Sequence, residues 1–410
     1  MGEWQSEGRF DVQKPLRTTA REVHTFDPDG DLILQLIRTP EKERDPVADE
    51  QRKDGEDANL NVVEGQEQAA GDAPHANDGT EEHKPAEDSK TETLSDDPER
   101  PSLEEIGANV DMIVSSRHLM LASPVFKAML RLDGFKEGHK LESAGKAEIP
   151  LPDDDPEALI ILLDIIHGRN RRIPRQISLD LMTKVTILVD KYQMVEAAEV
   201  FSESWIEHLK MSIPTEYVTP EDQTAVHKWI GISWVFGNRK EFQDMTMFVQ
   251  RGCGSDLEEK IEEGLLIPDI IIDTITQKRK DALFELYALV EQTIRRYQRQ
   301  DIFCLRTRDV ECRPSCDALL LGSLTRSASA LGIYPVPDSP YGTTCFDKLA
   351  IDMMNLNAEA LCDSIMPWSN SDPHKYGHGF HDAVKLKLDD LEKRLSGLDM
   401  GEYKKSKVGP

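Results

Sequence analysis

Cysteine and histidine side chains that could bind a metal ion gather in residues 301–382. Cys312 and Cys316 are separated by three residues, and His374 and His378 repeat that separation further along the chain. Zinc in proteins prefers four Cys or His ligands at the corners of a tetrahedron. The pattern therefore indicates a zinc site made of Cys312, Cys316, His374 and His378, either in a zinc-stabilised domain or in a zinc-dependent enzyme.

The same residues can also be interpreted without a metal or any other cofactor. No Cys-x-x-Cys pair is present, and 57 residues lie between Cys316 and His374, whereas the ligands of structural zinc sites are usually paired more tightly. Buried thiols beside a histidine-rich loop that contains glycine would give the same pattern. A catalytic Cys–His pair is a third interpretation, but nothing marks one cysteine as an activated nucleophile.

Motifs of the common catalytic classes do not occur in this sequence. There is no glycine-rich phosphate loop after a strand, no Gly-x-Ser-x-Gly and no His-Glu-x-x-His. These patterns mark nucleotide-binding sites, serine hydrolases and zinc proteases respectively. We therefore expect a protein without enzymatic activity.

Composition restricts the choice of partner and compartment. The chain has 410 residues and a net charge of −27, which argues against general nucleic-acid binding because phosphate contacts need a concentrated positive surface. No run of 18 apolar residues predicts a membrane span, and the sequence MGEWQSEGRF has no apolar signal segment. The six cysteines are therefore expected to be reduced thiols of an intracellular protein, and nucleus and cytoplasm are not distinguished.

A strongly acidic stretch interrupts the first half of the chain. Residues 41–100 contain 20 Asp and Glu against 7 Lys and Arg, a net charge of −13. Too few apolar residues are present to offset the entropy of ordering. We predict a disordered acidic insertion over 40–107, either as a solvated loop or as a docking segment for a basic partner.

Residues 109–136 have the most informative pattern in the chain, that of a strand followed by two helices. Val110, Met112 and Val114 alternate with polar residues, which predicts a strand with one buried face. Apolar residues then recur at helical spacing from His118 onward. A second helix is expected to start at Pro124, because Ser before Pro is a typical helix start.

This stretch resembles the BTB/POZ family. Its motif, in which a strand leads into a helical step, is matched by Leu119, Ser123, Pro124 and Phe126. Other family segments follow in order: a first strand that begins at Asp31, an Ile-x-Leu-Pro-Asp turn at 149–153 and a Val-Asp-Lys-Tyr segment at 189–192. The sequence departs from the pattern at Ser115 and Ser116, where many members have a histidine and a basic residue.

The resemblance implies an α+β fold, with a BTB/POZ-like domain (a small sheet with clustered helices) followed by a mainly α-helical C-terminal region. The layout is similar to that of single-BTB proteins of fungi. Members often dimerise, and some link substrates to a cullin-type ubiquitin ligase. The resemblance therefore implies a protein–protein interaction module, an adaptor or scaffold whose partners are a second copy or a cullin scaffold.

Carried over residue by residue, the partner-facing region of the family corresponds to Met129, Leu130, Phe135, Asp153, Asp154 and Asp155. Core positions are an equal alternative for Leu130, and the core is the favoured position for Phe126. A different function, that of a nuclear, transcription-linked regulator, would use the acidic insertion as an activation-like segment. It would also need a DNA-reading element, and we find none in the sequence.

The remaining segments complete the expected organisation. Residues 1–29 are expected to be a polar tail, 30–210 the BTB/POZ-like domain, 211–300 a helical region that includes a long helix from Pro268 to Arg299, and 301–382 the Cys/His region. An apolar stripe predicts an amphipathic helix at 383–400, followed by a tail at 401–410. This helix could pack on the chain itself or on a partner. The stripe consists of Val384, Leu388, Leu391, Leu395 and Leu398.

Overall fold

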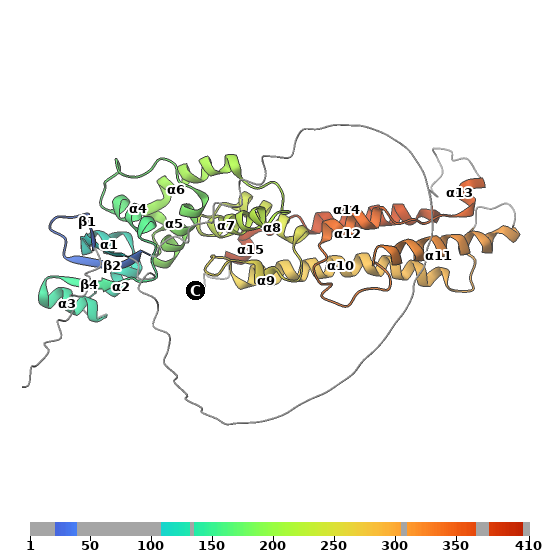
Figure 1. Ribbon diagram of the computed structural model, residues 1–410, viewed down its shortest axis with the longest axis horizontal. Coiled ribbons are helices and arrows are strands. Elements are labelled where there is room, and N and C mark those ends of the chain that lie inside the picture. Colours follow the sequence, from blue (N-terminus) through green and yellow to red (C-terminus); the bar gives the residue numbers. More distant parts are fainter. Residues whose placement is uncertain (1–20, 39–107, 132–134, 305–309, 366–376, 405–410) are drawn as a thin grey trace, which may run out of the picture. The chain divides into compact units, whose positions relative to one another are not determined.

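The computed structural model describes residues 21–38, 108–131, 135–304, 310–365 and 377–404. Their fold is mixed α+β, mostly helical, with one four-stranded sheet (Figure 1). The predicted acidic insertion at 40–107 and the tail residues from 405 onward lie outside the described residues. None of the described helices combines the length and apolarity that a membrane crossing requires.

Four strands form the sheet in the order β1-β3-β2-β4. They are β1 (Glu22–Thr25), β2 (Leu32–Arg38), β3 (Ala108–Val114) and β4 (Ala147–Pro150). Strand β1 is parallel to β3, and β2 is parallel to β4. Alternate side chains of β2 and β3 are fully or almost fully buried, as the period-two pattern predicts: Leu32, Leu34, Leu36, Val110, Met112 and Val114.

Strand β1 corrects the prediction of a polar tail over residues 1–29 at residues 22–25, whereas residues 1–20 of that tail lie outside the described residues. The sequence of β1, EVHT, has no alternating apolar pattern, and its one large apolar side chain, Val23, is 56% exposed. The strand instead pairs with β3, so that Glu22 lies beside Val110 and Thr25 beside Ile113. Pairing with a segment almost 90 residues away leaves no local signal in the sequence.

Helices α1 (Ser116–Ala122) and α2 (Pro124–Met129) follow β3 as predicted. The Ser123 hydroxyl caps α2 by accepting a bond from the Phe126 N–H at 3.0 Å, as side-chain oxygens do at helix starts. Phe135 is the N-cap residue of a third helix, α3 (Lys136–Ala144). Gly138 lies so close to Arg131 that an added Cβ would stand 2.2 Å from its carbonyl oxygen.

The predicted motif residues meet in one buried network. The Ser123 hydroxyl also donates to the Tyr192 carbonyl at 2.6 Å, and the Phe126 ring stacks on the Tyr192 ring with centroids 4.6 Å apart. The Asp154 carboxylate, itself buried, accepts bonds from the Tyr192 hydroxyl and from the Lys191 ammonium, the latter at 2.5 Å. Burial and the neighbouring Asp154 carboxylate raise the pKa of Tyr192.

The first hydrophobic core continues beyond the predicted domain end at residue 210. It runs from Phe26 to Ile275 and takes in helices on both sides of that point. These are α4 (Pro156–Ile166), α5 (Leu179–Tyr192), α6 (Val195–Leu209), α7 (Pro220–Phe236), α8 (Arg239–Gly252) and α9 (Leu257–Lys260). The 3-10 turn η3 (Lys210–Ser212), which follows α6, has no buried residue. The helical region after 210 is therefore packed on the same core as the sheet.

The long helix α10 (Asp269–Tyr297) belongs to two cores. Ile271 and Ile275 lie in the first, whereas the part from Ala282 to Ile294 lies in the second. The second core also includes side chains of α11 (Arg313–Ala330), α12 (Phe346–Met354), α13 (Leu361–Ile365) and α14 (Phe380–Arg394). In Figure 1, α14 runs beside α10, where the Glu285 carboxylate accepts bonds from Lys387 and Arg394.

The predicted apolar stripe near the C-terminus packs on the chain's own cores. Val384, Leu388, Leu391 and Leu395 are buried in the second core, and Leu398 in the first. The predicted helix 383–400 ends at Arg394, and a short helix, α15 (Met400–Lys404), follows.

Helix α8 holds this C-terminal segment by hydrogen bonds. The Arg251 guanidinium donates to the Leu395 carbonyl at 2.9 Å, and the Thr246 hydroxyl accepts from the Leu398 N–H at 2.9 Å. Gly397 has φ of +91°, and an added Cβ would lie 2.1 Å from the Gln243 carbonyl oxygen. Close backbone approach therefore requires glycine at this position.

Arg279 lies on α10 between the two cores and has no exposed surface. Its guanidinium donates to four backbone carbonyls, those of Cys253 (3.0 Å), Pro340 (3.1 Å), Gly342 (2.9 Å) and Thr344 (2.6 Å). Burial lowers the pKa of Arg279, yet an arginine stays charged in proteins. The four carbonyl dipoles therefore replace the water that this cation gives up.

We expect Asp154→Asn to destabilise the first core. The substitution removes the charge that Lys191 and Tyr192 bond to, and hydrogen bonds to a charged group contribute about 1.5–3 kcal/mol each. Urea unfolding followed by circular dichroism should show a lower midpoint. The exposed neighbour Asp153 provides the matched control: Asp153→Asn should change the unfolding free energy by less than about 0.5 kcal/mol. Equal effects of the two substitutions would contradict this assignment.

In Arg279→Met, the two cores should no longer unfold together. The substitution removes the common donor of four backbone carbonyls and the charge that they bind, so we expect the free energy of unfolding to fall by at least about 3 kcal/mol. Tryptophan fluorescence reports mainly on the first core, through Trp205, Trp229 and Trp234, and circular dichroism reports on all helices. The two unfolding curves should separate in Arg279→Met and coincide in the control Lys278→Met. Coincident, unshifted curves in Arg279→Met would rule out this role.

Candidate metal centre

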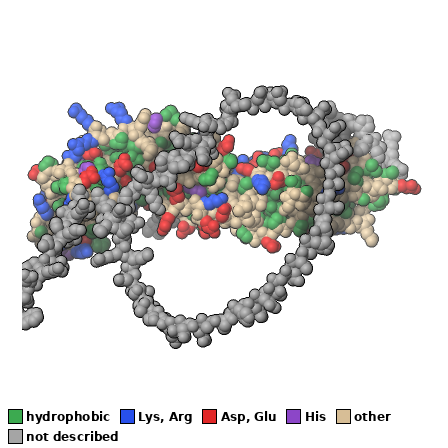
Figure 2. All heavy atoms as spheres, viewed as in Figure 1, with side chains coloured by type: hydrophobic (Ala, Val, Ile, Leu, Met, Phe, Trp, Pro, Cys, Tyr) green, Lys and Arg blue, Asp and Glu red, His purple; other side chains and the backbone are tan. Residues whose placement is uncertain are grey.

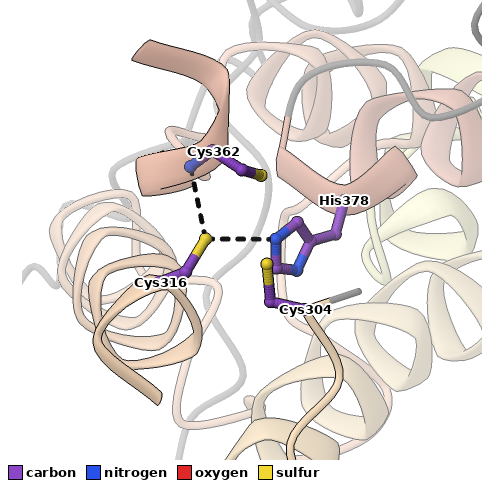
Figure 3. A group of neighbouring side chains, drawn as sticks. All are labelled: Cys304, Cys316, Cys362 and His378. Atoms are coloured by element: carbon purple, nitrogen blue, oxygen red, sulfur yellow. Dashed lines mark hydrogen bonds between the residues drawn. The ribbon is translucent and has the colours of Figure 1, made fainter. Parts of the chain in front are cut away.

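Four side chains that could bind a metal ion meet inside the C-terminal helical region: Cys304, Cys316, Cys362 and His378. Each offers one ligand atom, and the four atoms all lie within 4.8 Å of one another. Figure 3 shows the four side chains converging from separate segments, with the Cys316 Sγ atom 3.3 Å from the His378 Nε2 atom. The three cysteines are buried, with at most 2% of any of them exposed.

Each ligand comes from a different element. Cys304 lies in the segment that follows α10, Cys316 lies near the start of α11, and Cys362 lies in the first turn of α13. His378 lies in the 3-10 turn η5 (Gly377–Gly379), directly before α14. Its backbone is left-handed, with φ of +54° and ψ of +31°, a conformation that is uncommon in residues other than glycine. This turn directs the imidazole toward the thiols.

A second set of polar groups surrounds the first. The Tyr297 hydroxyl is 2.9 Å from the His378 Nδ1 atom, and one carboxylate oxygen of Asp317 is 3.6 Å from the same nitrogen. The other Asp317 oxygen accepts bonds from the backbone N–H groups of Phe303 (2.6 Å) and Cys304 (3.4 Å). Asp317 therefore fixes the backbone that carries Cys304 and also faces the imidazole of His378.

The electrostatic environment favours neutral thiols as long as no cation is bound. Burial raises the pKa of the Cys316 thiol, and it raises the pKa of the Cys362 thiol. Burial and the Asp317 carboxylate raise the pKa of Tyr297 to about 12. Catalytic cysteines have the opposite property, a lowered pKa and access to solvent. The Cys316–His378 contact therefore does not have the character of an activated nucleophile.

The structure brings together two of the four ligands that the sequence indicated. Cys316 and His378 belong to the cluster, whereas Cys312, in the 3-10 turn η4 (Val310–Cys312), is half-buried and outside it. His374 lies outside the described residues. Sequence spacing missed Cys304 and Cys362, because each stands alone in its segment with no second ligand nearby. Their only sequence signal is the type of residue itself.

The residues expected to face a partner divide into exposed and buried groups. Phe135 and Asp153 are exposed, and Met129 and Asp155 are half-buried. Leu130 and Asp154 are buried, at 4% and 3% exposed, so they serve packing and not partner contact. Among the fold-motif residues, Leu119, Ser123 and Phe126 are fully buried, as expected for Phe126. Pro124 is exposed at the start of α2, and Asp31 is half-buried.

In comparisons with known proteins, no family model, no curated protein and no solved structure matches this chain.

The thiols should differ sharply in reactivity. Cys312 and Cys345 are half-buried, whereas Cys253, Cys304, Cys316 and Cys362 are buried. Alkylation of a buried thiol requires local opening of the structure, and a raised pKa further reduces the thiolate fraction at neutral pH. N-ethylmaleimide labelling followed by peptide mass spectrometry should therefore modify Cys312 and Cys345 at least about tenfold faster than the other four.

Denaturant provides the control for this experiment. All six cysteines should react at similar rates once the chain is unfolded. Labelling of Cys316 in the folded protein as fast as that of Cys345 would contradict the burial of the cluster.

Proposed function

We propose that this chain is a protein–protein interaction module without catalytic activity, in which a BTB/POZ-like domain serves as an adaptor or scaffold. One observation carries the proposal: the residues on which the family resemblance rests contact one another. Ser123, Phe126 and Tyr192 are joined by a hydrogen bond and a ring stack, and Asp154 accepts the Tyr192 hydroxyl. Three motif segments far apart in the sequence thus form one packing unit, as a common fold would require.

The departure from the family pattern at Ser115 and Ser116 is compatible with such a domain. Asp31 accepts bonds from the Ser116 N–H at 2.7 Å and from the Ser116 hydroxyl at 2.6 Å. Neutral donors thus hold the strand aspartate where many family members are expected to use basic side chains. A positively charged pocket at this point is not needed to keep Asp31 in place.

The start of α3 offers a contact surface for a partner. Phe135 is 61% exposed at the N-cap position, and aromatic side chains are enriched at the centres of protein interfaces. The close approach of Gly138 to the Arg131 carbonyl fixes α3 beside the end of α2. Phe135 is therefore presented to solvent on a packed element, which supports its role in partner contact.

Charge on the surface is mixed, which suits a protein partner better than a nucleic acid. Figure 2 shows acidic side chains gathered near α9, where Glu258, Glu259, Glu262 and Glu263 are exposed. Basic side chains lie elsewhere on the same face. Nucleic-acid binding needs a continuous positive stripe or patch. The transcription-linked alternative rests on the acidic insertion, which lies outside the described residues, and it stays a prediction.

A binding assay on the full chain tests the proposal, because the first core crosses residue 210 and a truncated domain would lose part of it. The partner is the N-terminal domain of a cullin, and calorimetry measures the affinity. Phe135→Asp should weaken binding at least about tenfold, or 1.4 kcal/mol. Leu386→Asp is the matched control, because Leu386 is 70% exposed on α14 within the other core region, and it should leave affinity unchanged.

Light scattering on the same samples measures self-association. A dimer, or a complex with the cullin domain that depends on Phe135, supports the adaptor function. A chain that stays monomeric at all concentrations and binds no cullin domain would overturn the BTB-type proposal.

A further inference from the structure

We propose that Cys304, Cys316, Cys362 and His378 bind a single Zn²⁺ ion that holds the C-terminal helices together. This inference is independent of the interaction function proposed above, since none of its residues lies in the BTB/POZ-like part. It rests on the donor set, the separations of the ligand atoms, the groups around the imidazole and the burial of the thiols.

The donor set selects the metal. Three thiolates and one imidazole are the ligands of a common class of structural zinc site. Magnesium and calcium require oxygen ligands instead, so the three sulfur atoms exclude them. The three cysteines and the histidine thus match zinc by the chemistry of their ligand atoms alone.

The ligand atoms are separated as a single ion requires. Zn–S bonds of about 2.3 Å and Zn–N bonds of about 2.0–2.1 Å give tetrahedral edges of about 3.6–3.8 Å. The Cys316 Sγ and His378 Nε2 atoms are 3.3 Å apart, and no pair among the four exceeds 4.8 Å. Side-chain movements of about 1 Å would therefore complete the tetrahedron. A two-iron cluster would separate ligands on opposite metals further than this.

The groups around His378 fit a metal-bound imidazole. With Nε2 directed to the thiols, Nδ1 faces the Tyr297 hydroxyl and the Asp317 carboxylate. Metal-bound histidines typically donate their second ring N–H to a carboxylate or a similar acceptor. One oxygen of Asp317 is buried without a hydrogen-bond partner, and it is the oxygen that lies 3.6 Å from Nδ1. A small rotation of a metal-bound imidazole would bring the Nδ1–H group of His378 within hydrogen-bonding distance of this oxygen.

A closed coordination sphere makes this site structural. Four protein ligands leave no open position for water or substrate, which a catalytic zinc needs. Cys316 has no exposed surface, so a substrate cannot reach its sulfur atom. Cys316, His378 and Asp317 are also arranged like the thiol, imidazole and carboxylate of a catalytic triad. The burial of Cys316 and the presence of two further thiols, those of Cys304 and Cys362, favour metal binding over catalysis.

The ion would fix segments that have little stability of their own. Helix α13 has five residues, well below the length at which an isolated helix is stable. Cys362 lies 46 positions after Cys316, and His378 lies 62 positions after it. A metal bound to all of them cross-links long stretches of chain, so the free energy of metal binding contributes directly to folding.

Metal analysis of the full chain, expressed in zinc-containing medium, tests the proposal. Mass spectrometry of the purified protein should find one zinc per chain. Cys362→Ser should lose the metal and lower the melting temperature. Cys345→Ser, the matched control at a half-buried cysteine outside the cluster, should keep one zinc and the wild-type melting temperature.

Two further measurements keep the test decisive if Cys362→Ser does not fold. Wild-type protein in which Co²⁺ replaces zinc should show thiolate-to-metal charge transfer and the visible bands of tetrahedral cobalt. His378→Cys should retain the metal because a thiolate can replace the imidazole, whereas His378→Ala should lose it. A purely structural hydrogen bond of His378 would not produce this difference in metal content.

Several results would overturn the inference. Wild-type protein that contains no zinc, and whose melting temperature responds neither to added zinc nor to a chelator, has no such site. Iron together with acid-labile sulfide would identify an iron–sulfur cluster. Equal loss of zinc in Cys345→Ser and Cys362→Ser would place the metal elsewhere.

Discussion

A buried cation between two hydrophobic cores is the constraint on which the C-terminal half depends. Arg279 gives up all contact with water, and an unpaired buried charge is prohibitively costly. Its four carbonyl acceptors come from the end of α8 and from the segment 340–344. These backbones must be in position before the guanidinium can be buried. Burial of the charge therefore fixes the conformation of residues 340–344 relative to α10. Helix α10 in turn supplies apolar side chains to both cores.

The residues that carry the family resemblance are packing residues, and this limits what they reveal about partners. The Ser123 hydroxyl and the Phe126 ring contact Tyr192, and the Asp154 carboxylate binds Lys191. The exposed Phe135, by contrast, belongs to no tight pattern in the sequence. Motifs thus support a type of fold, while the identity of the partner depends on surface residues that vary freely without loss of packing.

Elements with local signals could be predicted from the sequence, and elements without them could not. Pro124, Pro156 and Pro268 mark helix starts, and α2, α4 and α10 begin at or directly after them. Strand β1 depends on a ladder with distant β3, so its four residues carry no pattern of their own. The cluster of three cysteines and one histidine shows the same limit. Spacing favoured Cys312 and His374 because each has a ligand-type neighbour, whereas the cluster draws one residue from each of four segments.

The way α8 binds residues 395–398 has a consequence for biosynthesis. Leu398 and Met400 complete the first core, which otherwise ends at Ile275, and the Thr246 and Gln250 side chains accept the backbone N–H groups of Leu398 and Gly397. A ribosome delivers the chain from its N-terminus, so the sheet and the early helices emerge long before these closing residues. Until then the part of the first core that Leu398 and Met400 cover stays open to water and to other nascent chains. Folding of the N-terminal half thus reaches completion only after the ribosome has synthesised the last helices.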